Sequence, residues 1–160
     1  MIALSLYPNA KGFGYCVVTE PCTFLDYGVV TVRPISNEKC LKRIQKLIKK
    51  YSVDTIIIQK LEGKNSHKST RVQKLHQLIE KLSKEQKLKL HAYTREQIRF
   101  VFKKHGAHTK YQIAKLITGW FEDDLKDYMP YYRRPWMCED YNQGIFDSVS
   151  LFLTHWYMNT

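Results

Sequence analysis

The first third of the chain contains three short runs in which apolar residues alternate with polar ones. Residues 2–7, 13–19 and 23–32 are rich in Val, Thr and aromatic residues, a pattern typical of β-strands. A turn over residues 8–12 joins the first two runs, and Pro21 and Pro34 mark the ends of the third. Because the connections are short, the pattern predicts an antiparallel meander.

After residue 35 the apolar residues recur at helical spacing, with Lys and Arg between them, and Ser36 is suited to cap a helix that ends near Tyr51. Residues 55–58 form a continuous β-branched run, which is typical of a strand covered by helices on both faces. A second helical stripe over residues 72–82 and a short strand over 88–93 follow.

The remaining sequence predicts helices. Thr94 is suited to cap one helix, Gly106 interrupts it, Thr109 opens another, and a last helix covers residues 145–156. The resulting order, β-β-β-α-β-α-β-α-α-α, is that of an RNase H-like α/β fold. We therefore expect a mixed five-stranded sheet with strands 1–3 antiparallel and helices on both faces.

Composition limits the number of domains and the setting in which the protein works. The 160 residues are 44% hydrophobic and show no linker or repeat, so we expect one domain over residues 1–160. We see neither a secretory signal nor an apolar run of roughly 20 residues, and expect a cytoplasmic protein without a membrane role. The four cysteines match no metal-binding spacing, and we expect reduced thiols.

Charge adds an expected partner. Lys and Arg number 26 against 15 acidic residues, a formal net charge of +11. A small domain this basic is suited to bind a polyanion, and nucleic acid is the leading candidate. The alternative is an ordinary lysine-rich surface that serves solubility.

Several segments, in order along the chain, resemble the RuvC Holliday-junction resolvases. They include the turn at Tyr7 followed by a Gly-Phe-Gly strand at 12–14, the strand ending at Gln59 with a Lys-Asn pair at 64–65, the Lys-Tyr-Gln-Ile helix start at 110–113, and a final helix that carries Asp147 and a Thr-His pair at 154–155. The resemblance covers nearly the whole chain and implies the RuvC type of RNase H-like fold.

The resemblance also identifies positions where this chain departs from the family. RuvC enzymes are two-metal nucleases whose Mg²⁺ ions need several converging carboxylates. The first-strand Asp of the family falls on Tyr7, its Glu on Gln59 or Ile58, and the earlier Asp of its last helix on Gly144. Only Asp147 keeps a carboxylate at a catalytic position, so we expect neither a metal cofactor nor cleavage.

Two alternatives concern the acidic residues. A relocated metal site of Asp147, Asp140 and Glu62 would make the protein a divergent, Mg²⁺-dependent crossover junction endodeoxyribonuclease or a related structure-specific endonuclease. In the simpler alternative, Glu62 and Asp140 are solvated loop acids, and Asp147 caps the helix that begins near Gly144.

The predicted nucleic-acid contacts are basic residues near the position of the family's active site and in a later loop: Lys60, Lys64, Lys68, Arg71, Lys110, Arg133 and Arg134. The spacing of the first four predicts that they share one face of a helix. The arginines belong to an aromatic stretch over residues 128–136, whose rings would either stack on unpaired bases or pack on the core.

The leading hypothesis is therefore a RuvC-like pseudonuclease that binds branched or structured nucleic acid, most plausibly DNA, without metal-dependent cleavage. The resemblance leaves open a homodimer of the kind that resolvases form. Besides the endonuclease described above, a protein-interaction subunit that binds no nucleic acid is the remaining alternative.

Overall fold

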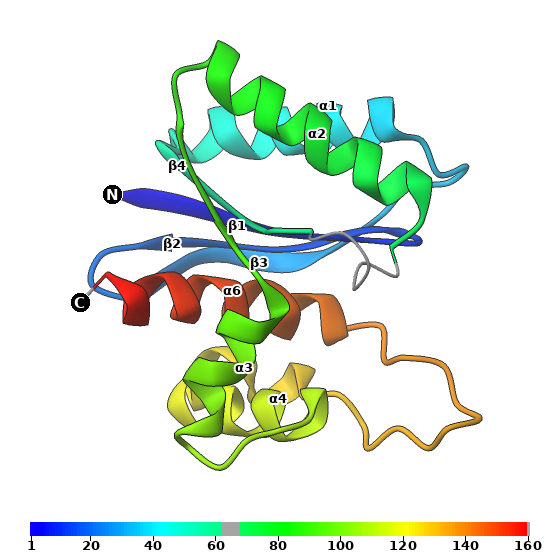
Figure 1. Ribbon diagram of the computed structural model, residues 1–160, viewed down its shortest axis with the longest axis vertical. Coiled ribbons are helices and arrows are strands. Elements are labelled where there is room, and N and C mark those ends of the chain that lie inside the picture. The colour runs from blue at the N-terminus through cyan, green and yellow to red at the C-terminus, as the bar shows by residue number, and fades with distance from the viewer. Residues whose placement is uncertain (62–67, 160) are drawn as a thin grey trace.

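A five-stranded sheet lies at the centre of the computed structural model, which describes residues 1–61 and 68–159 (Figure 1). Its strands are β1 (Ile2–Asn9), β2 (Gly12–Thr19), β3 (Thr23–Thr31), β4 (Thr55–Gln59) and β5 (Lys89–Tyr93). The first three strands form an antiparallel meander, and β4 and β5 continue the sheet in parallel pairing, in the order β3-β2-β1-β4-β5. The predicted mixed sheet is confirmed.

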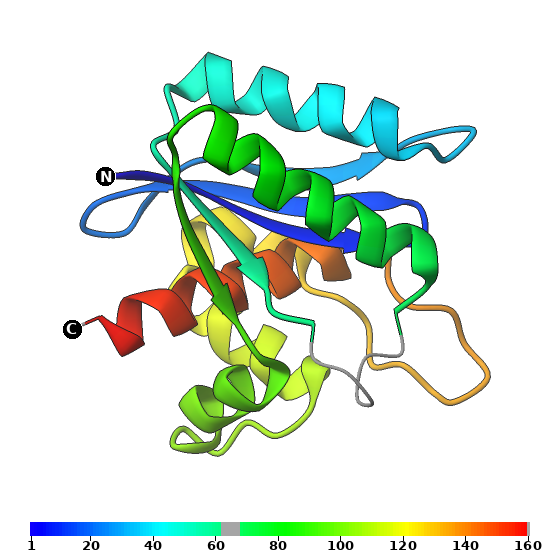
Figure 2. The ribbon, with the colours of Figure 1, turned by 45° about the horizontal axis from the view of Figure 1, so that its top comes forward.

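Helices cover both faces of this sheet (Figures 1 and 2). One face carries α1 (Asn37–Tyr51) and α2 (Thr70–Glu85), and the other carries α6 (Gln143–Met158). Two further helices, α3 (Arg95–Lys103) and α4 (Lys110–Trp120), pack against α6 on the side away from the strands. A short α5 (Glu122–Leu125) and the 3-10 turn η2 (Lys126–Tyr128) follow α4, and the sequence pattern did not predict them.

Local capping explains where the helices begin. The side chains of Ser36, Thr94 and Thr109 each accept a hydrogen bond from the backbone N–H three residues later, as predicted, and the two threonines form complete capping boxes. The start of α6 differs from the prediction, because Asn142 occupies its N-cap position. Asp147 lies one turn inside the helix, so the interpretation of Asp147 as a cap is wrong.

The apolar core is divided by the sheet into two layers. Ile56 and Ile58 face α1 and α2, whereas Ile57 faces α6 and the helices beyond it. All three side chains are at most 1% exposed, which confirms that this strand is covered on both faces. The strand β4 lies between β1 and β5, so it is paired on both sides. Its last residue, Gln59, lies at the end of the sheet where the carboxyl ends of β1 and β4 meet.

Close packing of α6 against the meander fixes the position of its first turn. A Cβ built on Gly14 of β2 would lie 2.1 Å from the carbonyl oxygen of Gly144, so the strand and the helix meet backbone to backbone. One turn further along, the Ser5 hydroxyl of β1 donates to the backbone carbonyl of Ser148 at 2.6 Å. These two contacts place Asp147 beside the end of β1.

The structure also bears on the expectation of reduced cysteines and on the search for a membrane-spanning segment. All four cysteines are free thiols, and Cys16 and Cys40 are buried. Across the described part of the chain, every helix is too short or too polar to cross a lipid bilayer.

Candidate functional site

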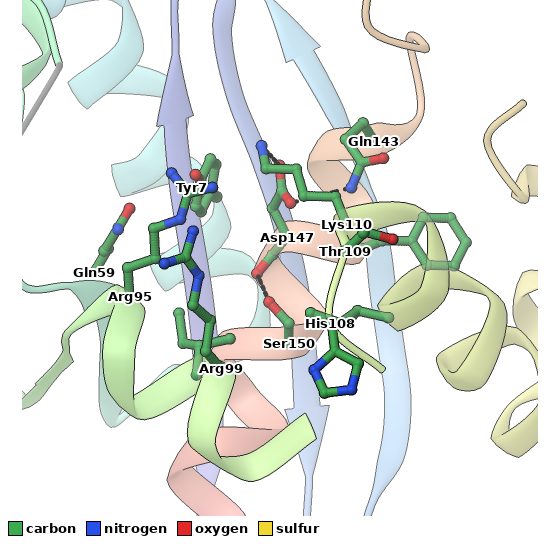
Figure 3. Close-up of a pocket in the computed structure, with 13 residues that line it drawn as sticks. Tyr7, Gln59, Arg95, Arg99, His108, Thr109, Lys110, Gln143, Asp147 and Ser150 are labelled. Carbon is green, nitrogen blue, oxygen red and sulfur yellow. Dashed lines mark hydrogen bonds and ion pairs between the residues drawn. The ribbon is translucent and has the colours of Figure 1, made fainter. Parts of the chain in front are cut away.

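A pocket of about 330 Å³ opens where the carboxyl ends of β1 and β4 meet the first turns of α3, α4 and α6 (Figure 3). Its lining is mostly polar or charged and consists of Tyr7, Gln59, Arg95, Ile98, Arg99, His108, Thr109, Lys110, Ile113, Gln143, Phe146, Asp147 and Ser150. The structure thus brings together four of the positions that the sequence pointed to, namely Tyr7, Gln59, Lys110 and Asp147.

Among the described residues, Asp147 is the one acid that lines this pocket, and its charge is already partnered. The residue is 7% exposed, and one carboxylate oxygen accepts a hydrogen bond from the Gln143 amide at 3.1 Å. The other oxygen lies 3.6 Å from the Lys110 ammonium. Burial raises the pKa of the Asp147 carboxyl above its ordinary range, although the nearby Lys110 ammonium opposes this shift.

Lys110 lies near two carboxylates and a tyrosine ring. Its ammonium lies 3.6 Å from Asp147, 3.5 Å from the Glu139 carboxylate, and 5.6 Å from the centre of the Tyr7 ring. Burial lowers the pKa of Lys110, but the Asp147 charge, with Tyr7 and Glu139, outweighs that effect and leaves the pKa above its ordinary value. The group therefore stays a cation across the physiological pH range.

Tyr7 is in contact with two lysines. Its hydroxyl accepts a hydrogen bond from the Lys68 ammonium at 3.2 Å, and the same ammonium lies 4.6 Å from the ring centre. Lys110 approaches the same ring from α4. A cation over a tyrosine ring is stabilised by the ring quadrupole, so this residue holds positive charge at the pocket where the resemblance places a metal-binding carboxylate.

Two arginines complete the basic lining, and the sequence reasoning missed both. Arg95 and Arg99 are one turn apart on α3, and Figure 3 shows both side chains extending from that helix toward Tyr7, in the space between Gln59 and Asp147. One sequence signal could have revealed Arg95. It is the first residue of its helix, where the helix dipole disfavours a cation.

The donor set does not fit the pair of Mg²⁺ ions that the fold family implies. Two hard cations need several converging carboxylates, whereas the described lining of this pocket offers one, which is hydrogen-bonded to an amide and paired with an ammonium. Within residues 1–61 and 68–159, no group of three or more His, Cys, Asp or Glu side chains could hold a metal. Of the relocated site, Asp140 accepts hydrogen bonds from the backbone of Asn142 and Tyr131, and Glu62 lies outside the described residues.

Gly144 is the remaining position from the resemblance, and it does not line the pocket. It faces β2, and a Cβ on it would lie 3.1 Å from the Gly14 Cα. A side chain at this position therefore requires the strand backbone to give way by a few tenths of an ångström. The packing of α6 on β2 accounts for a glycine here.

The predicted basic residues differ in their surroundings. Lys60 follows β4 and Lys68 precedes α2, so the expectation that Lys60, Lys68 and Arg71 share a helix face is wrong; Lys64 lies outside the described residues. The Arg71 guanidinium donates to the Asn9 carbonyl at 2.7 Å and to the Asn37 side chain at 3.0 Å, so it ties α2 to the β1–β2 turn and to α1. Arg133 and Arg134 are exposed.

Comparisons with known proteins give a consistent account of the fold. Neither a protein-family model nor a curated protein sequence matches the chain. Among solved structures, RuvC of Thermus thermophilus is similar with a TM-score of 0.68 at 16% identity, over 99% of this chain and 96% of that one. Its complex with a Holliday junction substrate gives a TM-score of 0.68 at 15% identity, again over 99% and 96%.

A second neighbour is the yeast mitochondrial Holliday junction resolvase Ydc2, with a TM-score of 0.66 at 14% identity over 98% of this chain and 78% of that one. Fold and topology together define this chain as an α/β protein of the RNase H-like type. More particularly, it has a RuvC-like fold over nearly its full length.

Proposed function

We propose that this protein binds branched or structured DNA through the basic pocket at the carboxyl ends of β1 and β4, and that it does so without metal-dependent cleavage. The observation that carries the proposal is the charge of the pocket. In the part of the pocket that the structure describes, Lys110, Arg95 and Arg99 accompany a single carboxylate, Asp147, which is already paired with Lys110.

Phosphate is the ligand chemistry that such a pocket favours. Arg95 and Arg99 present guanidinium groups, and these bind phosphate oxygens in bidentate geometry. Lys68 adds an ammonium beside Tyr7, and the net charge of +11 favours a polyanion over a small anion. Because such contacts neutralise phosphates without reading bases, affinity is expected to depend on DNA shape and salt.

The preference for branched DNA is supported by the fold. One solved structure with the same fold is RuvC bound to a Holliday junction substrate, and another is a Holliday junction resolvase. The absence of cleavage follows from the donor set, since Tyr7 and Gln59 supply no carboxylate beside Asp147. The expected homodimer is a further part of the proposal, and sedimentation velocity on the free protein tests it.

The deciding experiment is a gel with a labelled four-way junction and a linear duplex of the same sequence. Each is incubated with excess protein in EDTA, in Mg²⁺ or in Mn²⁺, and read for both shift and cleavage. We expect the junction to be shifted equally in all three and cut in none. Cleavage that needs the metal and is lost in Asp147→Asn would instead establish the endonuclease alternative.

A matched pair of variants locates the binding surface. Lys110→Met removes one charge from the pocket, whereas Lys46→Met removes one from the exposed surface of α1, on the opposite face of the sheet. We expect the first to weaken junction binding about fivefold and the second to change it by less than about twofold. Equal effects would place the DNA elsewhere, and no binding by the unaltered protein would favour a protein-interaction role.

A further inference from the structure

An exposed aromatic segment connects η2 to α6, and its rings do not line the pocket described above. We call residues 129–141 the aromatic loop; both ribbon views show it, in orange, projecting from the body of the molecule beside the start of α6 (Figures 1 and 2). Tyr132 is 60% exposed, Trp136 80% and Tyr141 64%. The alternative that these rings pack on the core is therefore wrong for the outer part of the loop.

The aromatic loop has a defined shape despite its exposure. The Arg133 Nε donates to the Met137 carbonyl at 2.8 Å, and the Met137 N–H donates to the Arg134 carbonyl at 3.0 Å. The Tyr131 hydroxyl donates to the Cys138 carbonyl, so the two limbs of the loop are bonded to each other. Such internal bonds fix the backbone from which the exposed rings project, which lowers the entropy cost of binding.

Cations accompany the rings. The Arg134 guanidinium lies 5.5 Å from the centre of the Tyr132 ring, and that ring packs edge to face with Tyr111 of α4, with the two ring centres 5.3 Å apart. Residues 131–136 contain three aromatic residues, two arginines and a proline, with neither an acid nor an aliphatic side chain. Flat aromatic and guanidinium surfaces stack on nucleobases.

The aromatic loop is also continuous with the basic pocket. Glu139, near its end, pairs with Arg133 of the loop at 3.8 Å and with Lys110 of the pocket at 3.5 Å. A second, smaller cavity lies between the two features, and its lining combines cations, acids and rings: Lys110, Tyr111, Tyr131, Arg133, Glu139, Asp140 and Gln143. A strand whose phosphates contact Lys110 would therefore bring neighbouring bases to the aromatic loop.

We propose that the aromatic loop stacks on unpaired bases, with Trp136 and Tyr132 as the contact rings, and thereby gives the protein its preference for branched over linear DNA. This inference rests on the DNA-binding function proposed above. The pocket supplies affinity for phosphate on any DNA, and the loop supplies the discrimination, because fully paired bases in a linear duplex present no open ring face.

The test compares a linear duplex with a duplex of the same sequence that contains unpaired 2-aminopurine bases. Binding is followed by fluorescence anisotropy of an end label, and stacking by quenching of the 2-aminopurine emission. We expect Trp136→Ala to weaken binding to the unpaired probe about tenfold and to abolish most quenching, while duplex binding changes by less than about twofold. Trp136→Phe keeps a ring and should retain most of both signals.

Phe100→Ala serves as the matched control, since Phe100 is an aromatic residue of α3 that is 54% exposed and does not line the pocket. It should leave both probes unaffected. If the unaltered protein binds DNA but Trp136→Ala binds both probes equally well, the loop inference fails and the proposed function stands. If Trp136→Ala instead abolishes self-association in sedimentation, the loop is a protein contact. If the unaltered protein binds neither probe, both proposals fail.

Discussion

The Lys110 ammonium lies 3.6 Å from the buried Asp147 carboxylate, and it reaches that carboxylate from the first residue of α4. A lysine side chain thus supplies positive charge beside the single acid found in the described lining of the pocket. Both charged groups have further partners within the protein. The Gln143 amide donates to the other Asp147 carboxylate oxygen, and the Tyr7 ring lies against the Lys110 ammonium. A phosphate that enters the pocket would therefore contact ammonium and guanidinium groups of the protein.

Replacing Asp147 by Asn should strengthen DNA binding. The change preserves size and leaves an oxygen for the Gln143 amide, but it removes the negative charge that competes with phosphate for Lys110. We expect affinity for a four-way junction to rise about threefold to tenfold at roughly 0.1 M salt, measured by anisotropy in EDTA. Unchanged or weaker binding would show that Asp147 does not oppose the ligand.

The two arginines of α3 should account for part of the salt dependence. In Arg95→Ala with Arg99→Ala, two phosphate contacts are lost, so the slope of log affinity against log salt should become shallower by about 2. The measurement is a salt titration of junction binding by anisotropy. Lys46→Ala on α1 provides the control, and an unchanged slope in the double variant would remove these arginines from the interface.

The fold was predictable because its local signals agree with one another. The continuous run at residues 55–58 predicted a doubly covered strand, and Thr94 and Thr109 marked two helix starts correctly. Each of these signals depends on residues within a few positions of one another, so the chain order alone reveals them. The RNase H-like topology then followed from the order of the elements, and the resemblance of several segments to the RuvC resolvases implied its RuvC type.

The pocket was less predictable because it depends on contacts between distant segments. Nothing near Lys110 in the sequence announces that it pairs with Asp147, 37 positions later, or that α3 directs Arg95 and Arg99 toward the same space. The contact between Gly14 and Gly144 likewise arises only when α6 packs on the sheet. Spacing along the chain was even misleading for Lys60 and Lys68, which lie outside any helix.

Adding a methyl group at Gly14 should destabilise the protein strongly. A Cβ there would lie 2.1 Å from the Gly144 carbonyl oxygen, and backbone on both sides leaves little room for adjustment. We expect Gly14→Ala to lower the free energy of unfolding by about 3 kcal/mol in urea denaturation. Gly119→Ala in α4 is the control, because its Cβ would meet no atom within 4 Å, and it should be neutral or stabilising by up to about 1 kcal/mol.

Burial of His76 on α2 should make stability depend on pH. Burial, with a contribution from Lys68, lowers the pKa of this imidazole to about 4, so the unfolded chain binds the proton more readily than the folded one. The free energy of unfolding should therefore be largest above about pH 6.5 and decline as pH falls toward 4, by at most about 3 kcal/mol from this group.

His76→Leu removes the titrating group while filling the same space. Urea denaturation of both proteins between about pH 7 and pH 4 isolates the contribution, because all other groups are shared. The loss of stability on acidification should be smaller in the variant. Parallel curves for the two proteins would mean that His76 titrates alike in the folded and unfolded chains.

The contact between Gly14 and Gly144 also limits how this molecule can change over evolutionary time. Placing a carboxylate at position 144 would require β2 and α6 to separate slightly, which perturbs packing that fixes the first turn of α6. Acids introduced by substitution at Tyr7 or Gln59 alone would leave that position without a carboxylate. A change toward a two-metal site would therefore involve the packing of a strand on a helix as well as the residues of the pocket.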